Sequence, residues 1–264
     1  MQKPINNPSL SVVRASMSVC AAGRANSYTM MIIVKSALAN SARRRQLREV
    51  IRRQAETVNA TVGLLFSLGL PVNGQMPPGL LSEISQFDDI LLASYADTYL
   101  NLTLKTITNL RYVHHHCLHT SPSFVFLDDD HGINVTQLHQ VFSKFSLPEV
   151  RGSIFGSINS KKAVVRNTGL KWFTGTADYP FPHYPDYPIG PCYIIGADLI
   201  PKLSIAAAFT RPLPNEDVYV GVMLMKLGVK IHPLSNMFVH MFGFTPSAVP
   251  LVGGLDFFVK ALKI

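Results

Sequence analysis

The sequence has no long apolar run, only three cysteines and only 15% charged residues. Residues 9–22 are interrupted by Arg14 and residues 30–34 have the length of a strand, so we find no segment that would cross a bilayer. Three cysteines allow at most one internal disulfide and say little about the compartment. With 47% hydrophobic residues in a chain of 264, the protein can still bury a sizeable core, which excludes a disordered protein.

Acidic residues are fewer than basic ones: the sequence has 16 Asp and Glu residues and 24 Lys and Arg residues. Many of the arginines fall between Arg43 and Arg53. Such an excess suits nucleic acid, a membrane surface or an anionic substrate such as a nucleotide sugar. The arginine cluster lacks interleaved aromatic residues and accompanies no nucleic-acid-binding motif. We therefore expect no nucleic-acid partner.

Short apolar segments alternate with segments of helical spacing along the chain. Strands are predicted at residues 28–34, 62–68, 89–93, 123–127 and 153–158. Helices are predicted at residues 41–59, 97–116, 197–209 and 215–227, with Asp97 capping the second. The proline-rich residues 179–191 predict a rigid surface loop, followed by a strand at residues 192–195. The alternation predicts an α/β fold, a mostly parallel twisted sheet flanked by helices, with ligands at the carboxyl ends of strands.

Three adjacent carboxylates, Asp128, Asp129 and Asp130, follow directly after an apolar predicted strand. Because side chains alternate along a strand, Asp128 and Asp130 are expected to point the same way and Asp129 elsewhere. Two carboxylates aimed at one site suit a hard cation such as Mn²⁺ or Mg²⁺ and leave room for the oxygens of a diphosphate. The alternative is a solvated acidic turn before a helix that begins near Asn134.

Two further groups of polar residues each have two interpretations. Glu216 and Asp217 lie in the first turn of the helix predicted at residues 215–227. There they favour the positive end of the helix dipole, so a structural role is the alternative to a catalytic one. A histidine cluster has the spacing of a metal site or of a solvated helix face, and it comprises His114, His115, His116 and His119.

A series of spaced segments carries the most specific signal in the sequence. In chain order they are residues 43–49 (RRRQLRE), 89–91 (DIL), 97–106 (DTYLNLTLKT), 128–134 (DDDHGIN), 171–173 (KWF), 184–187 (YPDY), 190–193 (GPCY) and 216–221 (EDVYVG). These segments resemble, in the same order, the motifs of the beta-1,3-galactosyltransferase family, which includes the brainiac and fringe-type glycosyltransferases. The resemblance runs from about residue 28 to residue 233.

The resemblance implies a GT-A-like fold and a defined reaction. A hexose would move from an alpha-linked UDP-sugar to the 3-hydroxyl of an acceptor glycan, on a glycoprotein or glycolipid, with inversion to a beta linkage. By the family pattern Asp217 is the expected general base and Glu216 the second choice. Mn²⁺ or Mg²⁺ would neutralise the leaving UDP. The expected metal ligands are Asp128, Asp130 and a late histidine, first His240 and second His232.

The resemblance also assigns substrate contacts. The donor is expected to meet Arg44, Arg48, Asp128 and Asp129. Aromatic faces suit the C–H surfaces of sugars, so the expected sugar contacts are Trp172, Tyr184 and Tyr187, together with Gly190. Packing beneath the proline-rich loop is the alternative for the aromatic residues. The histidine cluster would lie on a helix away from the cleft, which favours the solvated face.

Domain limits and location follow from the extent of the resemblance. Residues 1–27 are expected to be a poorly defined N-terminal segment and residues 28–264 the catalytic domain. The family's membrane anchor and stem are absent from the sequence, so we expect a type II membrane protein of the Golgi lumen only in a longer form. Three sequons agree with a secretory lumen, at Asn59, Asn101 and Asn134.

Departures from the family pattern keep a second hypothesis open. Ile51 stands where the family usually has Trp, and Pro191 and Cys192 replace two small glycines near the substrate cleft. The tail beyond Pro233 resembles the family poorly. The alternative is a catalytically inactive glycosyltransferase-like protein that binds a sugar or a partner. Such a protein would bind the donor without transferring its sugar.

Overall fold

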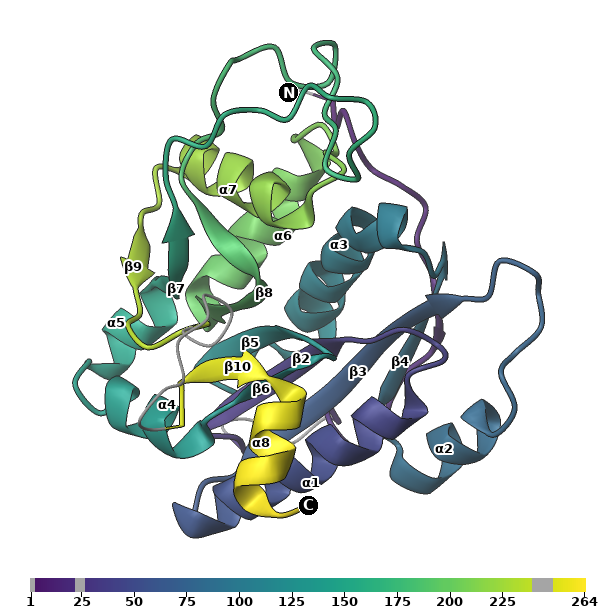
Figure 1. The fold of residues 1–264 in the computed structure, drawn as a ribbon, viewed down its shortest axis with the longest axis vertical. Coiled ribbons are helices and arrows are strands. Elements are labelled where there is room, and N and C mark those ends of the chain that lie inside the picture. The colour runs from purple at the N-terminus through teal and green to yellow at the C-terminus, as the bar shows by residue number, and fades with distance from the viewer. Residues whose placement is uncertain (1–2, 22–26, 239–248) are drawn as a thin grey trace.

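One eight-stranded sheet with helices on both faces organises the chain (Figure 1). The structure is a computed structural model and describes residues 3–21, 27–238 and 249–264. In spatial order the strands are β1 (Val12–Arg14), β4 (Ile90–Ala96), β3 (Val62–Leu70), β2 (Met30–Lys35), β5 (Ser123–Asp128), β8 (Tyr187–Gly196), β7 (Ile154–Asn159) and β9 (Ile231–Pro233). A two-stranded sheet accompanies it, formed by β6 (His131–Ile133) and β10 (Val252–Gly254).

The strands β4, β3, β2 and β5 are parallel neighbours at the centre of the sheet. Every residue of β2 is buried, as expected for a parallel strand covered by helices on both faces. β8 runs antiparallel to both β5 and β7, and β1 runs antiparallel to β4 at the edge. The predicted α/β fold class is confirmed. Each of the five strands expected from the apolar runs is present within a few residues of its predicted position.

An apolar core lies on each face of the sheet. Phe126 of β5 enters the core formed with α3 (Leu102–Tyr112), α6 (Ile200–Ala208) and α7 (Glu216–Leu227). Its neighbours Val125 and Leu127 enter the opposite core, because side chains alternate along a strand. The helices of that second core are α1 (Ser41–Thr57), α2 (Leu80–Phe87), α4 (Val135–Phe142) and α8 (Leu255–Leu262). The short helix α5 (Leu147–Gly152) precedes β7.

The helix predicted at residues 97–116 is divided into three parts. A 3-10 turn, η1 (Tyr99–Asn101), precedes α3, and a π-helical turn, η2 (Val113–Cys117), follows it. Asp97 does not cap this helix, so that prediction was wrong. Its carboxylate pairs with Lys105 at 2.9 Å and accepts a hydrogen bond from the Leu38 N–H at 3.2 Å. The helix expected near Asn134 is present as α4, and Asn134 itself caps it by accepting from the Gln137 N–H at 2.9 Å.

The proline-rich segment 179–191 is only partly a loop, because β8 already begins at Tyr187. Pro188 and Pro191 are tolerated in this strand for a local reason. The ladder between β8 and β5 starts only at Cys192, and the register opposite β7 shifts near Pro188. Neither ladder therefore needs an N–H from these prolines.

The N-terminal segment is part of the same fold rather than a separate unit. β1 extends the sheet, and Cys20 forms a disulfide with Cys117 at the end of η2. The third cysteine, Cys192, is free and buried in β8. Among the helices that the structure describes, none has the length and apolarity needed to span a membrane.

Candidate active site

Lys35 and Asp128 end two neighbouring parallel strands at the carboxyl edge of the sheet. The register pairs them across β2 and β5, and Lys35 Nζ lies 3.0 Å from a carboxylate oxygen of Asp128. Lys35 is buried, pairs with Glu216 of α7 and donates to the Gly190 carbonyl at 2.8 Å. Burial alone would lower the pKa of Lys35, but the carboxylates of Asp128 and Glu216 outweigh it and raise the pKa. Lys35 is therefore a charged link between two carboxylates.

The two carboxylates differ in exposure. The Asp128 side chain is 33% exposed, and burial raises its pKa although Lys35 opposes the shift. Glu216 is buried, and its second oxygen accepts from Thr106 Oγ1 and from the Tyr193 hydroxyl, each at 3.1 Å. Protein donors thus engage both oxygens of Glu216, whereas Asp128 keeps a face toward solvent.

Asp217 follows Glu216 in the first turn of α7 and is partly exposed. It accepts from the Val218 N–H at 2.8 Å, and the Gly190 backbone also hydrogen bonds to it. Burial, and after it the charge of Glu216, raises the pKa of Asp217 to about 6. A side chain at position 190 would place its Cβ 3.2 Å from Asp217 Oδ2, so glycine permits this close approach. The site thereby holds a partly open carboxylate whose pKa lies near neutrality.

Asp129 and Asp130 form the turn between β5 and β6. β5 ends at Asp128, so Asp129 and Asp130 lie outside the strand. The alternation of side chains along a strand therefore does not set their directions, and using it to predict them was wrong. Asp129 does point elsewhere, since it is buried and bonds to the loop after β2 and to α1. Its partners, at 2.8 to 3.2 Å, are Ser36 Oγ, the Ala37 N–H, Asn40 Nδ2 and Arg43. Asp130 is 52% exposed and pairs with His131 Nδ1 at 2.6 Å, which lowers the pKa of its carboxyl.

Two buried cations hold the loop after β2 in place. Arg44 is fully buried, donates to the Ala37 carbonyl at 2.7 Å and pairs with Glu83 at 2.6 Å. Lys105 donates to the Ser36 carbonyl and is itself buried. Arg44 was expected to meet the donor, but it has no exposed surface. We assign it to supporting the loop that Asp129 also binds.

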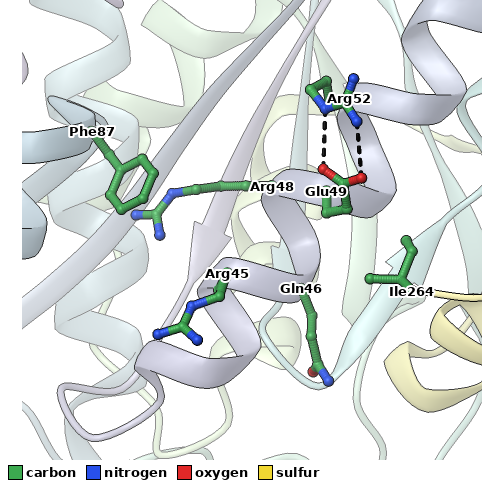
Figure 2. Close-up of a pocket in the computed structure, with 7 residues that line it drawn as sticks. All are labelled: Arg45, Gln46, Arg48, Glu49, Arg52, Phe87 and Ile264. Atoms are coloured by element: carbon green, nitrogen blue, oxygen red, sulfur yellow. Dashed lines mark hydrogen bonds and ion pairs between the residues drawn. The ribbon is translucent and has the colours of Figure 1, made fainter.

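Arg48, the second arginine expected at the donor, lies elsewhere. Its guanidinium pairs with Asp89 at 2.7 Å and with Glu83 at 2.8 Å, and it stands 3.9 Å from the ring centre of Phe87. Figure 2 shows Arg48 and Phe87 among the residues that line one pocket along α1. Arg52, another lining residue, is paired with Glu49. None of the residues that line this pocket belongs to the carboxyl edge described above. The structure does not bring Arg48 to Asp128.

The three aromatic residues expected at the sugar lie at different depths. Trp172 is exposed, and its carbonyl accepts from Asn215 Nδ2 at 3.3 Å, directly before α7. Tyr184 is buried and donates to Thr174 Oγ1 at 2.8 Å. Tyr187 is also buried beside α7, and burial, with Asp217 adding to it, raises its pKa to about 12. Of the three, Trp172 is exposed, while Tyr184 and Tyr187 are buried.

The predicted metal ligands are only partly placed by the structure. His240 lies outside the described residues, and His232 contacts the rings of Phe145 and Phe155. Within the described chain, no group of three His, Cys, Asp or Glu residues is arranged to hold a metal ion, the histidine cluster included. Asp128 and Asp130 nevertheless fit a hard cation, because both carboxylates reach solvent and lie close enough for the charge of Asp130 to raise the pKa of Asp128.

Sequence reasoning missed Lys35, the cation at the centre of the site. A signal for it does exist. Lys35 is the first charged residue after the apolar run of residues 30–34, just as Asp128 is the first after the apolar run of residues 124–127. Two parallel strands that end in opposite charges place an ion pair at the carboxyl edge when they are neighbours.

Comparison with known proteins places this chain in a family. The family model described as Galactosyltransferase matches residues 42–235. Human beta-1,3-galactosyltransferase 2 is 32% identical over 198 residues, which cover 74% of this chain and 47% of that protein. Human lactosylceramide 1,3-N-acetyl-beta-D-glucosaminyltransferase is 27% identical over 233 residues, covering 84% of this chain and 60% of that protein. The chain therefore spans about half the length of the first of these relatives.

One solved structure is a more distant match. The crystal structure of the galactosyltransferase LgtC in complex with donor and acceptor sugar analogues is 11% identical, with a TM-score of 0.47. The match covers 85% of this chain and 86% of that one.

Proposed function

Because this chain belongs to the galactosyltransferase family, we propose that it is an inverting, metal-dependent glycosyltransferase. It moves a hexose, galactose or an N-acetylhexosamine, from a UDP-sugar to a 3-hydroxyl of a glycan on a glycoprotein or glycolipid. The observation that carries this proposal is Asp217, a partly exposed carboxylate whose pKa is raised to about 6 beside the Lys35 and Asp128 ion pair.

A single displacement with inversion suits this arrangement. The acceptor oxygen forms a bond to the anomeric carbon as the bond from that carbon to the UDP oxygen breaks. The acceptor hydroxyl gives its proton to the Asp217 carboxylate, which can accept it because its pKa lies near the working pH. Glu216 is engaged by Lys35, Thr106 and Tyr193. Its charge, next to Asp217, contributes to the raised pKa of Asp217.

Asp128 and Asp130 are the proposed ligands for Mn²⁺ or Mg²⁺ from the described chain. When bound, the ion supplies charge that neutralises the departing diphosphate. We propose that Asp129 acts on this site indirectly. Its bonds to Ser36, Ala37 and Asn40 fix the loop after β2 against the turn that carries Asp130.

A donor screen tests the proposed function. The protein is incubated with UDP-galactose, UDP-N-acetylglucosamine or UDP-N-acetylgalactosamine and a mixed glycan acceptor pool, and released UDP is measured. We expect Mn²⁺-dependent UDP release from one donor well above that from the other two. Donor binding without UDP release from any of the three would instead support the catalytically inactive alternative.

The Asp130→Asn variant is expected to lose most UDP-dependent binding of Mn²⁺, because it removes a charged oxygen ligand and leaves the fold untouched at a half-exposed turn. Calorimetric titration of Mn²⁺ with and without UDP measures this. Asp129→Asn, which removes the neighbouring carboxylate, is the matched control variant. It should retain part of the Mn²⁺ binding but melt at a lower temperature, because Asp129 is buried among four protein donors. Equal Mn²⁺ affinity in Asp130→Asn and the parent protein would remove Asp130 from the metal site.

We further propose that the longer protein resides in the Golgi lumen, anchored as a type II membrane protein. The disulfide between Cys20 and Cys117 supports an oxidising compartment. Of the three sequon asparagines, Asn59 is exposed, whereas Asn134 is buried and its side chain caps α4. A glycosidase-sensitive mobility shift that Asn59→Gln abolishes would support this location, and an unglycosylated cytosolic protein would refute it.

A further inference from the structure

One arginine holds the connection between β7 and β8, the 160–186 loop, in shape. Arg166 Nη1 donates to the Thr174 carbonyl at 2.8 Å. Arg166 Nη2 donates to the carbonyls of Tyr179 and Phe181, at 2.7 and 3.0 Å. The guanidinium can bind these carbonyls together because its donors form a rigid planar fork. Arg166 is exposed, so the loss of its bonds should loosen the loop without opening the core.

Backbone bonds join the two ends of the same loop. The Val164 N–H donates to the Pro182 carbonyl at 3.0 Å, and the Tyr184 N–H donates to the Lys162 carbonyl at 2.9 Å. The ends of the loop therefore lie side by side. The arginine acts on the part between them, whose path these two bonds leave open.

The middle of the loop is attached to the chain that leads into α7, over which the loop passes (Figure 1). Asn215 Nδ2 donates to the Trp172 carbonyl at 3.3 Å. Asp178 of the loop pairs with Arg211 at 3.0 Å. Because Asn215 lies two residues before Asp217, these contacts place the middle of the loop next to the proposed catalytic carboxylate.

The strand that follows the loop meets the same carboxylate. Tyr187, the first residue of β8, packs directly on α7, since a Cβ at Gly221 would lie 2.4 Å from the Tyr187 Cβ. Burial, and after it the charge of Asp217, raises the pKa of Tyr187, as expected for neighbouring groups. Both the middle of the loop and its end are thus fixed beside Asp217.

We propose that Arg166 is a positioning residue, which fixes the 160–186 loop as one wall of the acceptor site. The acceptor hydroxyl must reach Asp217 to give up its proton, so a wall beside Asp217 meets the acceptor. Arg166 acts on the acceptor only through the loop. The assignment to the acceptor rests on the proposed function, whereas the bonds from Arg166 to the loop do not.

Tryptophan fluorescence tests the wall without requiring turnover, because Trp172 is the only tryptophan of the sequence and lies in the loop. The glycan pool of the donor screen is titrated into the protein in the presence of UDP and Mn²⁺. We expect a saturable change in the emission of Trp172 in the parent protein. The half-saturating concentration should be at least about tenfold higher in Arg166→Met, because the glycan must then order a loosened wall.

Steady-state kinetics separates positioning from a general structural role. In Arg166→Met the apparent KM for the glycan pool should rise about tenfold, while kcat and the UDP-sugar affinity stay within about twofold of the parent. Amide hydrogen exchange should be at least about tenfold faster at Thr174 and Tyr184 and unchanged in β2.

Two further variants distinguish the forked bonds from the charge. Arg166→Lys keeps the charge, but one ammonium group cannot reproduce the fork, so this variant should behave as Arg166→Met does. Lys162→Met removes a positive charge from an exposed side chain of the same loop and should match the parent.

Three results would overturn the proposal. The first is a Trp172 emission in the parent that no glycan changes, whether or not UDP is released. The second is unchanged amide exchange in Arg166→Met, or an Arg166→Lys variant that matches the parent. The third is a lower kcat or UDP-sugar affinity in Arg166→Met with an unchanged half-saturating glycan concentration. A glycan-dependent Trp172 signal that weakens in Arg166→Met, without UDP release from the parent, would support the wall and count against the proposed transfer reaction alone.

Discussion

An Asp217→Asn variant is expected to lose roughly a hundredfold to ten-thousandfold in kcat while its affinity for the UDP-sugar stays close to that of the parent. Asn has nearly the size of Asp and can still accept from the Val218 N–H, but it cannot take the proton of the acceptor hydroxyl. The loss therefore belongs to the chemical step. Steady-state kinetics and calorimetry of donor binding on one purified variant separate the two quantities.

The stability of the same variant distinguishes catalysis from a structural role at the start of α7. Burial raises the pKa of Asp217 from 3.8 to about 6, so ionising it at neutral pH opposes folding. A neutral Asn removes that opposition. We therefore expect the free energy of unfolding to be unchanged or to rise by up to about 1 kcal/mol, after allowing for the partial exposure of the side chain. The melting temperature should be unchanged or slightly higher. A lower melting temperature with intact kcat would show instead that Asp217 serves the helix. Asp198→Asn, at an exposed ion pair with Arg151, is the control for removing a carboxylate.

Replacing Lys35 with Met should have the largest effect on stability. Lys35 is buried and pairs with Asp128 and Glu216, so its removal leaves two carboxylates close together without a cation. Breaking a buried ion pair from one side costs about 3–5 kcal/mol, which for a domain of this size lowers the melting temperature by roughly 10 °C at pH 7. Thermal unfolding followed by circular dichroism measures the shift.

The pH dependence of the Lys35→Met defect identifies its cause. The folded-state pKa of Asp128 is already raised by burial, and losing Lys35 raises it further. The destabilisation should therefore be greatest at neutral pH and shrink as the pH falls and the carboxylates take up protons. Lys202→Met, at an exposed lysine of α6, should melt as the parent does. A defect in Lys35→Met that is independent of pH would point to lost packing rather than to unpaired carboxylates.

Apolar runs predicted the central strands of the sheet, but not its edge strands β1 and β9 or the contacts at the carboxyl ends of the strands. The segments 30–34 and 124–127 are buried strands whose side chains are all apolar, so helices can cover them on both faces. The sequence did not reveal which strands are neighbours, and only the pairing of Lys35 with Asp128 across β2 and β5 places a lysine in the site. A lysine seen in sequence alone is expected at the surface.

The arginines of α1 were misplaced for a similar reason. A basic helix in a chain that binds an anionic substrate predicts phosphate contacts. Arg44 and Arg48 are instead satisfied within the protein by Glu83 and Asp89, which are distant in sequence and gave no signal of the pairing. The start of α4 near Asn134, by contrast, follows from local sequence alone, because the residues after it have helical spacing.

The dependence of kcat on pH tests the central claim most directly, namely that Asp217 is a general base whose pKa the folded site raises. Because the ionised carboxylate is the active form, we expect kcat of the parent protein to fall as the pH drops through about 6. The residual activity of Asp217→Asn should lack this decline. A parent kcat that is constant from about pH 5 to pH 8, or an Asp217→Asn profile with the same decline, would contradict the account.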